Sequence, residues 1–219
     1  MQEFRKQMDA LTATTGREYE LTAAVPGGTD KIAKIEVNEV AKVLDAINIM
    51  SYDYRGSWDA AGPTNFHSNL FSDPNSPGSA DMRAHSVATS VDAWRSAGAP
   101  AAKLVVGVPF YGRGWTGVSG GGTGLYQPAS GAARGTYENG IEDYKVLRGL
   151  TGYTTHRDPV TKQMWIFNGS TFWSYDDAQV MADKGAYIRQ EGLGGAMIWS
   201  MDGDTNNGEL MSALDTALR

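Results

Sequence analysis

The stretch LDAINIMSYDYRGSW, residues Leu44–Trp58, contains the feature that decides how the chain is built. Its first half is an almost continuous apolar run, which is typical of a strand buried on both faces of a parallel sheet. The run then ends, and the seven residues from Tyr52 bring an aspartate, an arginine and three aromatic side chains. Packing a core does not require this set. In parallel α/β folds, functional residues collect at the carboxyl ends of strands, so this strand end is a candidate site.

Three other segments are predicted to be strands, and the last two of them are again nearly continuous apolar runs: Tyr19–Val25, Lys103–Tyr111 and Gly194–Met201. Segments with a helical spacing of apolar residues lie between the strands and after them. The predicted helices are Val37–Leu44, Ser86–Ser96, Asp177–Gln190 and Gly208–Leu218. This alternation indicates an α/β fold with a parallel sheet and right-handed crossovers.

The interval between Tyr111 and Gly194 exceeds 80 residues, which is more than one crossover helix and its loops need. It includes QMWIFNGSTFWSY, in which two short aromatic runs flank Asn168-Gly169, a strong hairpin turn signal. We therefore expect a small α+β subdomain inserted after the third strand. The expected division is residues 1–115 for three strands and their helices, 116–176 for the insert, and 177–219 for the last strand with its flanking helices.

Composition excludes several functions. The formal net charge is −6 and the 19 Lys and Arg residues are scattered, which argues against a nucleic-acid partner. The chain has no cysteine, so disulfides, thiolate catalysis and cysteine-ligated zinc are excluded. Its three histidines, His67, His85 and His156, lack metal-ligand spacing, and we expect neither a metal nor another cofactor. No apolar run reaches the ~18 residues of a membrane-spanning helix, so no membrane partner is expected.

Two further strand ends carry aromatic and charged residues. The third strand is followed by Tyr111 and Arg113, and the fourth ends in Trp199, Met201 and Asp202. Any single aromatic residue is more often part of the core than of a binding site, but here such residues occur at the ends of several strands. Ring faces with nearby Asp, Arg and Tyr side chains suit a sugar chain, because pyranose rings stack on tryptophan and hydroxyl groups take the hydrogen bonds.

Four segments together resemble a known family: LDAINIMSYDYRGSW, AAKLVVGVPFYGRGW, WSYDD and GLGGAMIWSMDGD. They are similar to the C-terminal half of the catalytic domain of a glycoside hydrolase family 18 chitinase, of the bacterial type with an α+β insertion domain. The resemblance implies that the four strands are the fifth to the eighth of a (β/α)8 TIM barrel. It also implies a chitin or chitooligosaccharide substrate and a full-length protein that is secreted.

The resemblance assigns the catalytic roles to the opening stretch. Tyr52 matches the tyrosine that hydrogen-bonds the substrate's N-acetyl group, and Asp53 matches the aspartate that polarises the subsite at the scissile bond. Met50 matches the methionine that packs beneath them. Enzymes of this family are an exception to the two-carboxylate scheme, because the substrate's own acetamide oxygen attacks the anomeric carbon. A tyrosine hydroxyl aimed at the acetamide suits the positioning that such a mechanism requires.

Other residues are expected to bind the sugar chain. Trp199 resembles the tryptophan under the sugar to be cleaved, and Trp58 resembles a platform on the leaving-group side. Tyr111 and Arg113 belong to a Tyr-Gly-Arg motif and are expected to contact the sugar or a carboxylate. Two aromatic residues of the insert are weaker candidates for the cleft wall: Trp165 and Tyr175. His67 resembles a loop residue that is structural or at the cleft rim.

The family's general acid is absent from this chain. It comes from a DxxDxDxE motif, and the nearest acidic cluster here, Asp202, Asp204 and Glu209, has a different spacing. The chain begins in an amphipathic helix with Phe4 on its apolar face, so we interpret Met1 as an internal methionine of a longer protein. Four such strands leave two open edges. We therefore expect the chain to be inactive alone and to need the N-terminal barrel half, or self-association, to close the fold.

Three functions are compatible with these residues. The leading hypothesis is a hydrolase that cleaves β-1,4 links between N-acetylglucosamine units with retention. A chitinase-like lectin would keep the aromatic cleft without the acid and bind chitooligosaccharides without cleaving them. An endo-β-N-acetylglucosaminidase would act on glycoproteins, but aromatic platforms favour a long unbranched chain.

Overall fold

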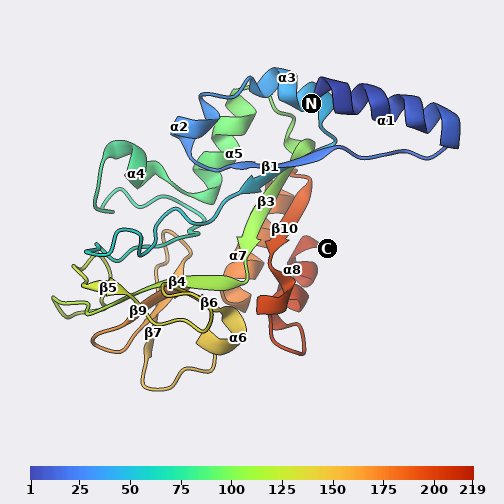
Figure 1. Cartoon of the computed structure of the whole chain (residues 1–219). Coiled ribbons are helices and arrows are strands. Elements are labelled where there is room, and N and C mark those ends of the chain that lie inside the picture. The colour runs from blue at the N-terminus through green and yellow to red at the C-terminus, as the bar shows by residue number, and fades with distance from the viewer.

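The computed structural model describes residues 1–219, and its first β-sheet is parallel (Figure 1). The strands of this sheet are β1 (Thr22–Pro26), β2 (Ala46–Met50), β3 (Leu104–Pro109) and β10 (Gly195–Trp199). They lie in the order β1-β2-β3-β10, and each neighbouring pair is parallel. All four predicted strands are therefore present, and the parallel α/β expectation is confirmed.

Helices connect and cover these strands. In chain order they are α1 (Gln2–Thr15), α2 (Thr29–Ile32), α3 (Val37–Val43), α4 (Ala80–Ala84), α5 (Val87–Ser96), α7 (Ala178–Gln190), α8 (Glu209–Leu218) and two 3₁₀ turns, Ala101–Lys103 and Met201–Gly203. Two starts follow from capping side chains: Ser86 accepts a hydrogen bond from the backbone of Thr89, and Asp177 accepts one from Val180. None of the helices has the length and apolarity needed to cross a bilayer.

The insert forms a second, antiparallel sheet with one short helix. Its elements are β4 (Tyr111–Thr116), β5 (Gly131–Ala132), β6 (Ile141–Asp143), α6 (Tyr144–Leu147), β7 (Thr154–Arg157), β8 (Met164–Phe167) and β9 (Phe172–Tyr175). The order is β5-β4-β9-β8-β7, and β6 also pairs with β4. The predicted hairpin is confirmed, since the Asn168 side chain accepts hydrogen bonds from the backbone of Ser170 and Thr171 between β8 and β9.

The boundary of the insert differs from the prediction. We expected the first segment to run to residue 115, but β4 starts at Tyr111 and pairs with β6 and β9 of the second sheet. The chain leaves the parallel sheet at Pro109, where β3 ends. The apolar run Lys103–Tyr111 continues past the end of β3 into the first residue of β4, so it did not reveal where the chain changes sheet.

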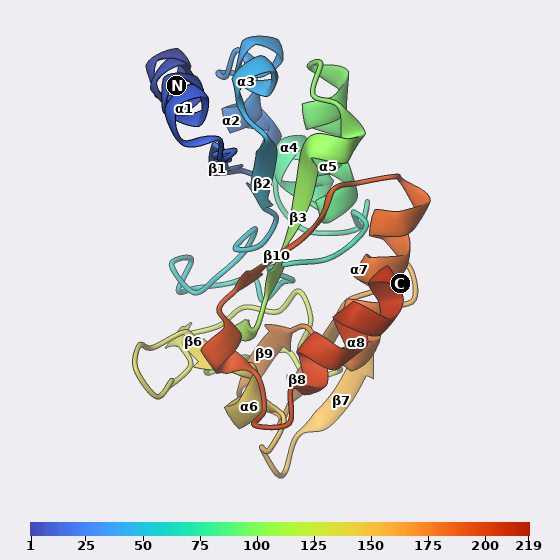
Figure 2. The same ribbon diagram turned by 90° about the vertical axis from the view of Figure 1, so that its right-hand side faces the viewer.

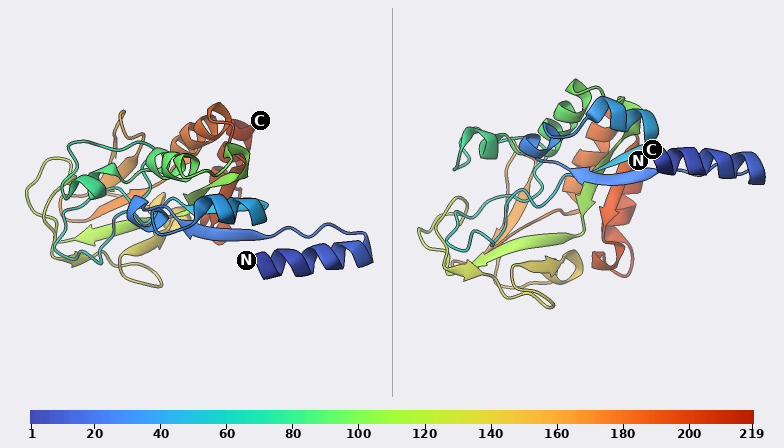
Figure 3. Two further views of the ribbon diagram at one scale, coloured as in Figure 1. Left: turned by 90° about the horizontal axis from the view of Figure 1, so that it is seen from above. Right: turned by 45° about the horizontal axis from the view of Figure 1, so that its top comes forward.

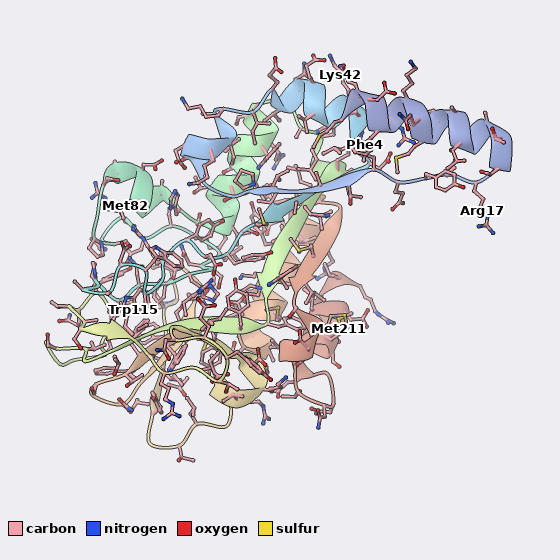
Figure 4. The ribbon with its side chains drawn as sticks, in the orientation of Figure 1. Phe4, Arg17, Lys42, Met82, Trp115 and Met211 are labelled. Atoms are coloured by element: carbon pink, nitrogen blue, oxygen red, sulfur yellow. The ribbon has the colours of Figure 1, made fainter.

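Two hydrophobic cores hold the sheets. The larger lies around β2, β3 and the helix α5, where Ile47, Val106 and Trp94 are fully buried. The second belongs mostly to the insert and consists of Phe66, Trp115, Val118, Trp165, Phe167 and Phe172. Figure 4 marks Trp115 in this second region. The insert therefore has a core of its own.

The edges of the parallel sheet are less covered than predicted. The segment Gly194–Met201 was expected to be buried on both faces, but the strand β10 is only half-buried and Trp199 is exposed. The reason is that β10 and β1 each pair with one neighbour only. Viewed from the side, the four strands form an open sheet and not a closed barrel (Figure 2).

The helix α1 projects from the body of the protein (Figure 3). It contains no buried residue, and Phe4 is 68% exposed on it (Figure 4). The guanidinium group of Arg5 attaches the helix by donating to Asp45 at 2.9 Å and to the backbone oxygen of Tyr19 at 3.0 Å. The apolar face that the sequence predicted on this helix has no partner within the chain.

Candidate active site

Asp53 lies in a strained turn directly after β2. Its φ is 58°, in the left-handed region that non-glycine residues seldom adopt. The preceding Ser51 is buried, and its hydroxyl donates to the backbone oxygen of Gly107 at 2.9 Å. Gly107 permits this close approach, since a Cβ there would lie 2.4 Å from the Ile49 oxygen and 2.8 Å from the Tyr52 ring. The turn is thus fixed against β3.

Three hydrogen bonds hold the carboxylate of Asp53. The Tyr111 hydroxyl and Nε of Arg113 each donate to Oδ1 at 2.8 Å, and Nη2 of Arg113 donates to Oδ2 at 2.8 Å. This is the two-pronged guanidinium–carboxylate geometry that combines charge with fixed orientation. Both donor residues come from β4, so the antiparallel sheet completes a site that begins on the parallel one.

The ionisation states of the site follow from this arrangement. Burial alone would raise the pKa of the Asp53 carboxyl, but His67 and Arg113 outweigh burial and hold it well below its usual range. Burial, with a further contribution from the Asp53 charge, raises the pKa of Tyr52 to about 12. The same two causes raise the pKa of Tyr111 above its usual value. At neutral pH the aspartate is therefore an anion and both tyrosines are hydrogen-bond donors.

A pocket of about 460 Å³ opens beside these groups at the carboxyl ends of β1 and β2. Its lining consists of Pro26, Gly27, Gly28, Lys31, Met50, Tyr52, Asp53, Tyr54, Trp58 and His85. The structure thus brings together four residues that the sequence analysis placed in the site: Met50, Tyr52, Asp53 and Trp58. A pocket of this size is within the range of small-molecule sites.

Two tryptophans at the carboxyl ends of the parallel strands have exposed rings, and Trp58 but not Trp199 lines the pocket. Trp58 is 56% exposed, and the Arg113 guanidinium carbon lies 5.2 Å from its ring centre. Gly56 makes room for it, because a Cβ there would lie 2.2 Å from the indole. Trp199 is 61% exposed at the end of β10, opposite Pro109 of β3. Large exposed aromatic faces at one edge of a sheet are typical of a ligand surface.

Three predicted residues have other surroundings. Trp165 and Tyr175 are each 5% exposed and belong to hydrophobic cores, so the expectation that they reach the cleft wall is corrected. Trp165 packs on Phe66 with ring centres 5.4 Å apart. Tyr111 is 6% exposed, and its hydroxyl donates to Asp53, so in this structure it acts on the carboxylate.

Two residues that sequence reasoning did not place in the site also contribute to it. Tyr54 lines the pocket, and its hydroxyl donates to the backbone oxygen of Ser86 at 3.0 Å. His67 is fully buried with Nδ1 3.6 Å from Oδ1 of Asp53. Tyr54 lies in the aromatic segment Tyr52–Trp58 that the sequence analysis identified as a candidate site, so its position could have been predicted. For His67 the sequence indicated only a loop residue that is structural or at the cleft rim, because only folding of the loop brings it to Asp53.

One group of side chains has the composition of a metal site. Ligand atoms of Asp30, Asp81 and His85 lie within 4.8 Å of one another at the edge of the pocket. Nζ of Lys31 lies 3.3 Å from Asp30 and already supplies a positive charge there. The histidine spacing had predicted no such group. Asp81 and His85 are four residues apart at α4, and only folding brings Asp30 to them.

An anionic aspartate, tyrosine hydroxyls and exposed indoles at the carboxyl edge of a parallel sheet are features of carbohydrate-active α/β proteins. Comparison with known proteins makes the assignment specific. The model of glycosyl hydrolases family 18 matches residues 1–204, and the chain belongs to that family.

Relatives and solved structures agree with this assignment. The chain is 41% identical to Chitinase 63 of Streptomyces plicatus over 219 residues, covering 99% of this chain and 34% of the relative. The catalytic domain of psychrophilic chitinase B from Arthrobacter TAD20 superposes with a TM-score of 0.91 at 36% identity, over 99% of this chain and 49% of that one. The expectation of part of a TIM barrel with an insert is therefore confirmed.

A third similarity is to a protein described as a pseudo-chitinase. Human YKL-39, "a pseudo-chitinase with retained chitooligosaccharide binding properties", has a TM-score of 0.91 at 28% identity, covering 99% of this chain and 63% of that one.

The chain spans about a third of the length of Chitinase 63 and about half of the Arthrobacter catalytic domain.

Proposed function

We propose that this chain provides the acetamide-binding half of a chitinase-type active site, which hydrolyses β-1,4 links between N-acetylglucosamine units with retention. The observation that carries the proposal is the Asp53 carboxylate, held as an anion by Arg113 beside the Tyr52 hydroxyl and the pocket. The exposed rings of Trp58 and Trp199 support a sugar-chain ligand.

The geometry suits a reaction in which the substrate's acetamide oxygen is the nucleophile. The Tyr52 hydroxyl, kept protonated by its raised pKa, donates a hydrogen bond that orients the acetamide. As the acetamide oxygen bonds to the anomeric carbon, positive charge develops on the acetamide group. The Asp53 anion stabilises that charge, because its three donors keep it in place before the reaction begins.

Protonation of the leaving oxygen is assigned to residues outside this chain. The chain has no DxxDxDxE motif, and a glycosidic oxygen leaves poorly without a general acid. The unpaired outer edges of β1 and β10 support a closed barrel formed with an N-terminal half. We also assign the full-length protein to the extracellular space, since an insoluble polysaccharide cannot enter a cell.

The test compares the isolated chain with a completed domain. The chain is co-expressed with the N-terminal barrel half of a family 18 relative, and turnover of chitooligosaccharides is measured. The isolated chain should show none, and the completed domain should release products whose anomeric configuration is retained by NMR. Turnover by the isolated chain would contradict the missing acid. A completed domain that neither binds nor cleaves the oligomers would contradict the function.

Variants locate the chemistry within the completed domain. Tyr52→Phe and Asp53→Asn should each lower kcat by about 10²-fold or more, the effect of removing one group that stabilises the transition state. Tyr137→Phe is the matched control, because Tyr137 is 86% exposed and outside the pocket. Equal rates for Tyr52→Phe and Tyr137→Phe would remove Tyr52 from the mechanism.

Binding without hydrolysis is the second candidate, favoured by the similarity to a pseudo-chitinase. The exposed tryptophans would serve a lectin as well as an enzyme. Because the acid lies outside this chain, a half borrowed from an active relative cannot separate the two. Calorimetry and turnover on the domain completed with the protein's own N-terminal half do so, since a lectin binds oligomers and releases no product. Turnover on N-glycans compared with chitin oligomers tests the third possibility, an endo-β-N-acetylglucosaminidase.

A further inference from the structure

A buried histidine contacts the candidate site and has no role in the mechanism above. His67 lies in the loop after β2, and its side chain is fully buried. Neither ring nitrogen has a hydrogen-bond partner within 3.5 Å. Buried polar atoms are nearly always paired, so an imidazole with two unpaired nitrogens next to a catalytic carboxylate calls for an explanation.

The position of His67 is fixed by its neighbours. Its backbone oxygen accepts a hydrogen bond from the amide of Tyr54 at 3.0 Å, which joins the loop to the residue after Asp53. Its ring packs against the ring of Tyr111, with centres 5.3 Å apart. The next residue, Ser68, donates from its hydroxyl to Asp176 at 2.6 Å. The imidazole is therefore held in place from both sides and faces Asp53 with Nδ1 3.6 Å from Oδ1.

We propose that His67 is a positioning residue that carries its proton on Nδ1 and acts as an additional donor to Oδ1 of Asp53. This inference deepens the proposed function and rests on it for its effect on turnover. A carboxylate only accepts hydrogen bonds, so Nδ1 attracts it only when protonated. A second proton on Nε2 would place an unpaired donor and a positive charge in a fully buried site near Arg113, at considerable cost.

The origin of the donors shows what His67 adds. Tyr111 and Arg113 both come from β4, a strand of the antiparallel sheet. His67 comes from the loop that follows β2 and Asp53, and this loop also packs on the insert through Phe66 and Ser68. His67 therefore contacts Asp53 from a chain segment other than β4. Hydrogen bonds in ligand-free active sites are often long and shorten once substrate is bound, which is consistent with a separation of 3.6 Å.

The first test reads the tautomer and needs no activity. The chain has three histidines, so the double variant His85→Gln/His156→Gln leaves His67 as the one imidazole in a ¹⁵N NMR spectrum. We expect Nδ1 to show the shift of a protonated ring nitrogen and Nε2 that of an unprotonated one at neutral pH. Asp53→Asn should move the Nδ1 resonance. The opposite tautomer, or an Nδ1 resonance unaffected by Asp53→Asn, would overturn the proposal.

The second test uses a matched pair of variants. The amide nitrogen of His67→Asn lies near the place of Nδ1, whereas that of His67→Gln lies near the place of Nε2. The Asp53 carboxyl should titrate at higher pH in His67→Gln than in His67→Asn, as followed by ¹³C NMR, with circular dichroism confirming that both fold. If neither variant folds, the tautomer measurement decides alone. Equal titration in the two variants would overturn the proposal.

In the completed domain, His67→Gln should lower kcat at least about tenfold, as expected when a catalytic group is displaced, and His67→Asn should restore much of it. Similar losses in both variants would indicate a merely structural residue and overturn the positioning role. A wild-type domain that binds no chitooligosaccharide would reject the proposed function, while the tautomer and titration would still decide on His67.

Discussion

The two sheets of the protein differ in how far the chain itself completes them. In the antiparallel sheet every residue of β8 and β9 is buried, and aromatic side chains close a core around them. In the parallel sheet, β1 and β10 are partly exposed, and Trp199 is left open to solvent. The comparison shows that the insert has a small core of its own and also packs into the larger core through Met164, Ile166, Trp173 and Tyr175. The outer strands of the parallel sheet keep exposed surface.

The candidate site lies where the two sheets meet. Asp53 lies in the turn after the parallel strand β2, and Arg113 belongs to the antiparallel strand β4. Neither sheet alone fixes an ionised aspartate, because the carboxylate comes from one and its guanidinium from the other. The insert is thus a structural part of the site rather than an addition to the barrel.

The largest effect should come from opening the antiparallel core. Phe172→Ala removes a fully buried ring, and we expect the free energy of unfolding to fall by about 3–5 kcal/mol in urea denaturation. Ile198→Ala, on the half-buried strand β10, should cost only about 1 kcal/mol. Equal losses of the free energy of unfolding in the two variants would show that both sheets bury these positions equally and would contradict the difference between them.

The next largest loss of stability should come from breaking a contact between α7 and the end of the antiparallel sheet. Lys184 of α7 and Asp176 after β9 form a fully buried ion pair, to which Ser68 and Gln163 also donate. Lys184→Met should lower the free energy of unfolding by about 3 kcal/mol, because it leaves a buried carboxylate without its cation. The control Lys184→Met/Asp176→Asn should recover part of this loss. A double variant less stable than the single one would argue against the ion-pair explanation.

The Asp53–Arg113 pair predicts a dependence of stability on acid. Because the pKa of Asp53 is lowered in the folded protein, its contribution is present above the unfolded value of about 3.9 and is lost as the pH falls through the folded one. In Asp53→Asn the loss of stability between pH 7 and pH 3 should therefore be smaller than in the wild type. Arg113→Gln should act in the same direction but less strongly, because His67 also lowers the pKa of Asp53, and the double variant should match Asp53→Asn. Identical acid profiles of wild type and Asp53→Asn would refute this coupling.

The smallest effect on stability should come from replacing the exposed ring of Trp58. Trp58 is 56% exposed, so Trp58→Ala should change the free energy of unfolding by no more than about 1 kcal/mol, including its contact with Arg113. Its binding of chitooligosaccharides in the completed domain should nevertheless weaken at least about tenfold, as for loss of a stacking platform. Tyr137→Ala, another exposed aromatic residue, is the control and should alter neither quantity. Unchanged binding by Trp58→Ala would remove Trp58 from the ligand surface.

Periodicity and capping residues were sufficient to predict most elements. The strand β3, the hairpin at Asn168-Gly169 and the helix that starts after Ser86 lie where the sequence placed them. Prediction failed where tertiary contacts decide whether a side chain is buried or exposed. Trp165 and Tyr175 are aromatic like a cleft wall, yet Phe66 of the loop after β2 and His156 of β7 pack on Trp165, and Tyr144 of α6 packs on Tyr175. Aromatic content alone does not tell a platform from a core, because both use the same side chains.

The sequence by itself determined the parallel strands, the inserted subdomain and the polar strand end at Tyr52 and Asp53, because these depend on local patterns of apolar and turn residues. Only the tertiary structure decided that Arg113 pairs with Asp53, that His67 faces the same carboxylate, and that Trp199 is left exposed. These contacts join residues far apart in the chain. They follow from how one sheet packs on the other, and no local pattern of residues encodes that packing.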